Sequence, residues 1–173
     1  PFYSINFPIK NAPRFLDERL IISYVGVFDF NRGLENLLEV VSIQKNVELK
    51  IAGFGALEKL VIEFSNTNEN IKFLGKISYY EALDTIRKSD LLYACYHLSN
   101  PVHKYAAPNK YYESLFTNTP VITTVGTLVS SKVLEFNTGF CIEESKDALI
   151  QLFNNRNLLF EIDKKSKNCK NLW

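Results

Sequence analysis

Short apolar runs alternate along the chain with stretches in which apolar residues recur every three or four positions. Residues 20–27 form the first run, which is typical of a strand buried on both faces of a sheet. Apolar residues then recur at i, i+3, i+4 and i+7, the spacing of an amphipathic helix, from Leu34 onward. Continued to the end of the chain, this pattern predicts strands at residues 20–27, 47–52, 71–74, 90–96, 120–124 and 139–142, and helices at residues 34–41, 57–64, 79–88, 108–116, 129–136, 147–153 and 157–172.

This alternation predicts an α/β fold with a mainly parallel sheet and helices on both faces. Right-handed crossovers make such a domain doubly wound and Rossmann-like, with the strand order 3-2-1-4-5-6. The domain should cover residues 20–173. Residues 1–19 contain three prolines without a clear period and are predicted to be an extended lead-in or linker. Because the sequence contains no Met, even at its start, we expect it to be a piece of a longer protein.

Sheets of this kind bind ligands beyond the carboxyl ends of their strands. Those ends are expected at residues 25–32, 53–56, 75–78, 97–110 and 124–127. Gly53 and Gly55 are expected to form a tight turn, and they and Gly26 would let the backbone pass close to a ligand. Residues 97–107 are expected to form a long loop.

One predicted helix carries a cation at its N-terminus, where the helix dipole disfavours positive charge. Pro108 suits the first helical position, Asn109 follows, and Lys110 lies in the first turn. An anion held between this lysine and the free N–H groups would reverse the penalty. Glu113 shares the surface with Lys110 and could accept hydrogen bonds from sugar hydroxyls. A phosphorylated sugar would suit this arrangement; the alternative is an exposed Lys–Glu pair without a ligand.

Arg32 repeats this pattern, because it lies just before the helix at residues 34–41. Two cations at two helix N-termini on the same edge of the sheet favour a shared phosphate ligand. The pair Gly53 and Gly55 also resembles the start of a dinucleotide fingerprint. The third glycine of that fingerprint would fall at Glu58, so NAD binding is disfavoured.

Several side chains are expected in the core. Tyr112, Leu115 and Phe116 can share one helix face and are predicted to point inward. Cys95 and Cys141 lie in apolar runs and are predicted to be buried. Three cysteines that are far apart fit neither a disulfide framework nor a zinc site, and no other metal-site or catalytic motif is present.

The composition is that of an ordinary globular domain. Of the 173 residues, 46% are hydrophobic and 23% are charged. The net charge of +1 gives no reason to expect a nucleic-acid partner. No apolar run reaches the length of about 18 residues that a membrane span requires.

Through the order and spacing of several short segments, the sequence resembles the C-terminal, donor-binding domain of retaining glycosyltransferases of the GT-B fold, family four (group 1). The resemblance covers roughly residues 20 to 165. Its pieces are Tyr-Val-Gly-Val at 24–27, Arg-Gly at 32–33, Leu-Lys-Ile-Ala-Gly-Phe-Gly at 49–55, Ile-Lys-Phe-Leu-Gly at 71–75, Ser-Asp at 89–90, and Pro-Asn-Lys-Tyr-Tyr-Glu-Ser-Leu to Pro-Val-Ile at 108–122.

The resemblance assigns roles to individual positions. It implies that Arg32 contacts a diphosphate and that Glu113 binds ribose hydroxyls. It places the loop at residues 75–78, with Ile77, near the nucleotide base, and lets the glycines at 53–55 pass close to the nucleotide. Two positions differ from the family pattern: Val27 stands where many members have Arg, and Tyr105 stands where many have a first Glu. The form of residues 106–113 resembles a subset involved in bacterial surface polysaccharides, in which Lys110 could replace the missing arginine.

The implied reaction moves a sugar from a nucleotide diphosphate sugar to a hydroxyl acceptor, with retention at the anomeric carbon. Cations and helix N-termini would stabilise the diphosphate leaving group, so neither a metal nor a cofactor is expected. The implied partners are the nucleotide sugar and a missing N-terminal Rossmann-like domain. A cytoplasmic enzyme is implied, with the inner face of the membrane as an alternative location if the acceptor is lipid-linked. The alternatives are a sugar-nucleotide epimerase of similar fold, and a non-catalytic nucleotide-binding or interaction module.

Overall fold

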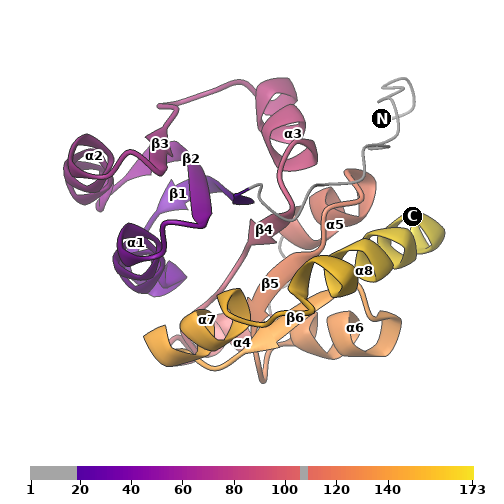
Figure 1. Ribbon diagram of the computed structural model, residues 1–173. Helices are drawn as coiled ribbons and strands as arrows, with labels where there is room; N and C mark the ends of the chain where they lie inside the picture. The colour runs from indigo at the N-terminus through magenta and orange to yellow at the C-terminus, as the bar shows by residue number, and fades with distance from the viewer. Residues whose placement is uncertain (1–18, 106–108) are drawn as a thin grey trace.

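A six-stranded, all-parallel sheet forms the centre of the computed structural model, which describes residues 19–105 and 109–173 (Figure 1). The strand order is β3-β2-β1-β4-β5-β6. The strands are β1 (Leu20–Phe28), β2 (Val47–Gly55), β3 (Ile71–Phe73), β4 (Leu91–Tyr93), β5 (Val121–Thr124) and β6 (Gly139–Ile142). The predicted fold class and strand order are therefore confirmed.

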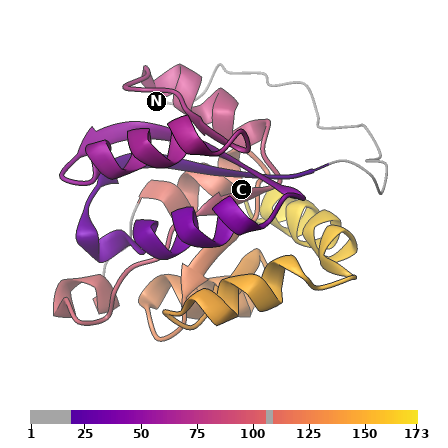
Figure 2. The same cartoon turned by 60° about the vertical axis from the view of Figure 1, so that its left-hand side comes forward.

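Helices cover both faces of this sheet (Figure 1). A short 3-10 turn, η1 (Phe30–Arg32), precedes α1. The helices are α1 (Leu34–Ile43), α2 (Glu58–Thr67), α3 (Tyr79–Arg87), α4 (Pro101–Tyr105), α5 (Asn109–Phe116), α6 (Leu128–Phe136), α7 (Lys146–Phe153) and α8 (Leu158–Leu172). Figure 2 shows α1 and α2 in front of strands β1 and β2. The predicted elements are present, and their boundaries differ by a few residues.

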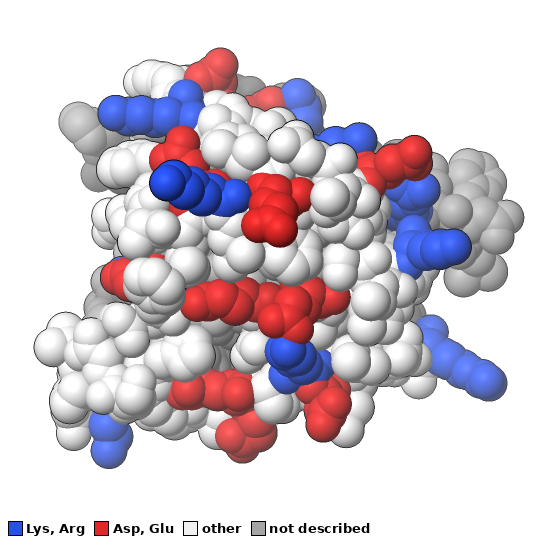
Figure 3. Space-filling view, turned by 90° about the vertical axis from the view of Figure 1, so that its left-hand side faces the viewer, with Lys and Arg blue, Asp and Glu red and all other residues white. Residues whose placement is uncertain are grey.

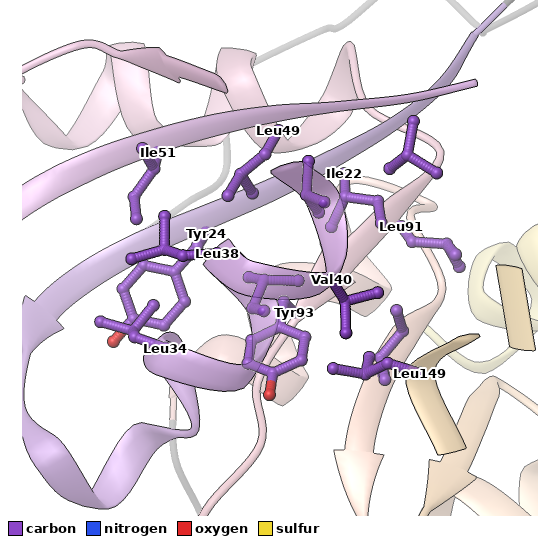
Figure 4. Packing of buried hydrophobic residues seen from close by; sticks show 14 of the residues in the cluster. Ile22, Tyr24, Leu34, Leu38, Val40, Leu49, Ile51, Leu91, Tyr93 and Leu149 are labelled. Carbon is purple, nitrogen blue, oxygen red and sulfur yellow. The ribbon is translucent and has the colours of Figure 1, made fainter. Parts of the chain in front are cut away.

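The larger core lies between β1, β2 and β4 and the helices α1, α2 and α7. Figure 4 shows Tyr24 of β1 and Tyr93 of β4 among aliphatic side chains that include Leu38 of α1 and Leu149 of α7. A smaller cluster on the other face joins residues of α5, α6 and β5. Burial of these apolar groups, at about 25 cal/mol per Å², is the main force that fixes the layers.

Helix α8 belongs to both clusters. Leu158 and Ile162, in its first half, pack in the larger core, whereas Cys169, in its second half, is fully buried in the smaller one. The helix therefore passes from one layer of the domain to the other.

The tight turn predicted at Gly53 and Gly55 is wrong, because β2 continues through both residues and pairs with β1. Both glycines have positive φ angles, 144° and 146°. A Cβ atom on Gly53 would lie 1.8 Å from the carbonyl oxygen of Gly26, and one on Gly55 would lie 2.5 Å from that of Phe28. Glycine is required here because the two strands approach closely, and not because the chain reverses.

Two further expectations need correction. The loop predicted at residues 97–107 contains the short helix α4; residues 106–108, including Pro108, lie outside the described part of the chain. In α5 it is Tyr111 that is buried beside Leu115, whereas Tyr112 is 42% exposed. Phe116 is half-buried and packs against Trp173.

Cys95 is buried as predicted, and Cys141 is only half-buried, against the smaller cluster. On the face covered by α1 and α2, acidic and basic side chains are interspersed (Figure 3). Among the described helices, none combines the length and apolar character needed to cross a membrane.

Candidate functional site

A cluster of two cations lies at the carboxyl end of β1, where the sheet meets the start of α5. The ammonium group of Lys110 lies 5.2 Å from the centre of the Tyr24 ring. A Cβ atom on Gly26 would lie 2.6 Å from the Lys110 Nζ atom. Glycine at position 26 therefore leaves the space that the lysine head group occupies.

Arg32 supplies the second cation from η1. Its guanidinium carbon lies 4.6 Å from the centre of the Tyr96 ring. The next residue, Gly33, has a φ angle of 64° and is the N-cap of α1, and no side chain caps the helix there. The Tyr93 hydroxyl donates to the Gly33 carbonyl at 3.0 Å and fixes this turn on β4. Arg32 thus stands beside the first N–H groups of α1, which no side chain caps.

The two cations are close enough to repel each other. The pKa of Lys110 is lowered from 10.5 to about 8, first by burial and then by the charge of Arg32, while Glu113 acts in the opposite direction. None of the ion pairs among the described residues includes Lys110 or Arg32. A buried ammonium group beside a second cation, with no carboxylate partner among the described residues, is costly in free energy unless an anion joins them.

Glu113 lies on the same helix as Lys110, three residues further along. Burial raises the pKa of its carboxyl group, and Lys110 partly offsets this effect. Glu113 lines a pocket of about 520 Å³, together with five other residues of the described part of the chain: Tyr79, Asn109, Tyr112, Phe116 and Trp173. Glu113 therefore lies close enough to Lys110 to feel its charge and also lines a mainly aromatic pocket.

A smaller hollow of about 160 Å³ lies at the carboxyl ends of β1 and β2. Gly26, Gly53 and Ile77 line it, together with Val27 and other neighbouring residues. The Gly53 N–H donates to the Gly75 carbonyl at 2.9 Å, which holds the loop after β3 against β2. Lys76, in this loop, places its ammonium group 5.1 Å from the centre of the Phe54 ring.

The structure thus brings together most of the candidate residues inferred from the sequence. Arg32, Lys110 and Gly26 form the cation cluster, and Asn109 lines the aromatic pocket with Glu113. Gly53 and Ile77 line the hollow. Gly55 differs from the others, because it packs against the backbone of Phe28 and lines neither cavity among those described.

Sequence reasoning missed two aromatic residues of the site, Tyr24 and Tyr96, whose rings lie beneath the two cations. Burial raises the pKa of the Tyr96 hydroxyl to about 12, and Arg32 partly opposes the shift. Their position near the carboxyl ends of two adjacent strands was visible in the sequence. Their use as supports for cations was not, since tyrosine in a buried strand normally signals packing alone.

A sheet with this order and a site at its carboxyl edge define one half of a GT-B fold. The C-terminal domain of LpcC, a group 1 glycosyl transferase from Francisella tularensis, is similar over 90% of this chain and 86% of its own, with a TM-score of 0.65 and 16% identity. The glycosyltransferase WaaG, involved in lipopolysaccharide biosynthesis, gives a TM-score of 0.68 and 18% identity. The match covers 90% of this chain and 42% of WaaG.

Anabaena HepE, solved in complex with UDP-glucose, gives a TM-score of 0.70 and 13% identity over 89% of this chain and 43% of its own. The chain therefore spans less than half the length of WaaG and of HepE. A comparison with curated proteins found no match. The model of the family Glycosyl transferases group 1 matches residues 7–170, and the chain belongs to this family.

Proposed function

We propose that this chain is the donor-binding half of a retaining glycosyltransferase, which moves a sugar from a nucleotide diphosphate sugar to a hydroxyl acceptor. Membership of the group 1 family supports sugar transfer. The similarity to WaaG and to UDP-glucose-bound HepE supports a nucleotide sugar as donor. A role in bacterial surface-polysaccharide synthesis, in the cytoplasm or at the inner face of the membrane, is part of the same proposal.

The observation that carries the proposal is the pair of neighbouring cations, Arg32 and Lys110, for which the described residues supply no ion-pair partner; Arg32 also stands beside the N-terminus of α1. A diphosphate would satisfy both charges and also accept from the first N–H groups of the helix. A monoanion would leave part of the positive charge uncompensated. The site is therefore best matched by a ligand with at least two negative charges in adjacent groups.

The neighbouring residues indicate where the ribose and the base of the donor would bind. Glu113 accepts hydrogen bonds from the ribose diol, because an ionised carboxylate offers only acceptors and the diol offers two donors. The base lies toward the hollow lined by Gly26, Gly53 and Ile77. During transfer, Arg32 and Lys110 stabilise the negative charge that develops on the leaving diphosphate.

The acceptor site belongs to the other Rossmann-like half of such an enzyme. The chain alone is therefore expected to bind the donor and to show little or no transfer. A thermal-shift screen of UDP, GDP and ADP with their sugar conjugates would identify the base.

Calorimetry on Arg32→Ala tests the phosphate assignment. The substitution should weaken binding of the identified nucleoside diphosphate by about 1–3 kcal/mol, the scale of a charge-assisted hydrogen bond, and affect the free nucleoside much less. Lys104→Ala is the matched control, because Lys104 is an exposed cation on α4 that also contacts an aromatic ring. Equal losses for nucleoside and diphosphate would contradict the assignment.

A second candidate function is a nucleotide-binding module that has lost catalysis. It is favoured by Val27 and Tyr105, which stand where the resemblance leads one to expect Arg and Glu and which are exposed by 49% and 72%. Turnover of nucleotide sugar by the full-length protein would exclude it. Binding without turnover, in the presence of acceptors, would support it.

A further inference from the structure

The aromatic pocket beyond Glu113 has a chemistry of its own. Its volume is about 520 Å³, and four of the six described residues that line it are aromatic: Tyr79, Tyr112, Phe116 and Trp173. Asn109 and Glu113 supply the polar groups. An apolar wall with a few polar groups is the usual composition of a small-molecule site.

We propose that this pocket binds a neutral saccharide ring, at a position separate from the diphosphate site. Aromatic faces carry partial negative charge and attract the weakly positive C–H groups on the flat side of a sugar ring. The Asn109 amide can donate to and accept from hydroxyl groups, and the lone pairs of the Glu113 carboxylate that the ribose diol leaves free can accept from them. Together these residues offer both kinds of contact that a sugar needs.

The arrangement of the rings favours a puckered ligand over a planar base. Phe116 and Trp173 meet at 67°, with centroids 5.4 Å apart, and therefore form a corner. A base is held best between parallel rings, whereas a sugar ring can place one face on Trp173 and an edge on Phe116. Trp173 is 58% exposed and Tyr112 is 42% exposed, so both rings offer free surface.

The charge of the side chains that line the pocket determines which class of sugar it can bind. Among the described residues that line the pocket, Glu113 is the only one with an acidic side chain, and none has a cationic side chain. Phosphorylated and carboxylated sugars are therefore disfavoured, and neutral sugars fit. The nearest cation, Lys110, lies one helical turn from Glu113, toward the diphosphate site.

The chain provides its own probe, because Trp173 is its single tryptophan. Titration of the protein with maltose or methyl α-glucoside should change the Trp173 fluorescence saturably in the millimolar range. Glucuronate should bind more weakly. Tyr112→Ala should weaken the saccharide by about three- to tenfold, the scale of one aromatic contact. Phe160→Ala, which removes an exposed ring of α8 outside the pocket, should leave it unchanged.

The test separates this proposal from the donor role. Arg32→Ala should weaken the nucleoside diphosphate and leave saccharide binding unchanged, and Tyr112→Ala should do the reverse. Saturation-transfer NMR on Trp173→Ala replaces the optical signal and should show reduced transfer to the sugar. The proposal is overturned if neither sugar produces a saturable change, or if uridine changes the Trp173 signal and the sugars do not.

Discussion

Replacing Lys110 by methionine should stabilise the ligand-free protein and weaken its binding of a nucleoside diphosphate. The pKa of Lys110 is lowered from 10.5 to about 8 in the folded protein. At about 1.4 kcal/mol per pKa unit, this favours a neutral group by roughly 3 kcal/mol. The contact with the Tyr24 ring opposes this effect by about 1–2 kcal/mol, and methionine keeps most of the apolar packing. A net gain of about 1–2 kcal/mol in unfolding free energy is expected at neutral pH.

The gain should depend on pH in a defined direction. Below pH 8 the lysine is charged in the folded and the unfolded state, so its full cost is present. As pH rises from about 8 to 10.5, the folded protein loses this proton before the unfolded chain does. The buried charge then no longer destabilises the wild type, and the difference in unfolding free energy between the variant and the wild type disappears.

Urea unfolding of the wild type and Lys110→Met across this pH range measures the effect. Lys104→Met is the control, because Lys104 lies over the Tyr105 ring at 5.7 Å and is exposed to solvent. The control should change stability little at any pH. A Lys110→Met protein that is less stable than the wild type at neutral pH, or a difference that does not change with pH, would refute the reasoning.

Three further predictions concern the site and the strands that support it. In a Lys110→Ala protein with weakened nucleoside diphosphate binding, the additional change Val27→Arg should restore that binding, since an arginine at position 27 lies on the same edge of the sheet. Calorimetry that finds no recovery would contradict a phosphate site shared by these positions. Glu113→Gln should weaken a ribonucleotide by about 1–2 kcal/mol and barely affect its 2′,3′-dideoxy analogue. Equal losses for both, or a lower melting temperature without ligand, would assign Glu113 a structural role. Gly53→Ala should strongly lower the unfolding free energy, because its Cβ would overlap the neighbouring strand, whereas Gly75→Ala meets no atom within 4 Å and should cost only backbone strain of about 1 kcal/mol. Similar losses in the two variants would show that strand approach is not what requires Gly53.

The sequence was sufficient for the sheet order because each strand is a short apolar run and each helix has a clear period. The sequence was not sufficient where one pattern of residues fits two different local structures. Glycines at 53 and 55 fit a turn as well as a close strand contact, and only the partner strand decides between them. Adjacent tyrosines at 111 and 112 offer α5 two possible inward faces, and packing against neighbouring elements selected Tyr111.

The site could be anticipated to a similar extent. Parallel topology places the ends of β1 and β4 at one edge, which is why Arg32 and Lys110 were expected near each other. The burial of Lys110 against Tyr24 depends on the shape of the edge, and no sequence period encodes it. The aromatic pocket combines Tyr79, Glu113 and Trp173 from three separate helices or their ends, so no local motif announces it.

The path of α8 has a consequence for how the domain is made in the cell. Because its two halves complete different apolar clusters, the larger core cannot close fully until residues 158–162 have left the ribosome, and the smaller cluster cannot close until Cys169 has followed. The earlier part of the chain would expose unfinished apolar surface on both faces of the sheet during synthesis. Chaperone binding to the nascent chain should therefore persist until α8 emerges and then fall, first as the larger core closes and then as the smaller cluster closes.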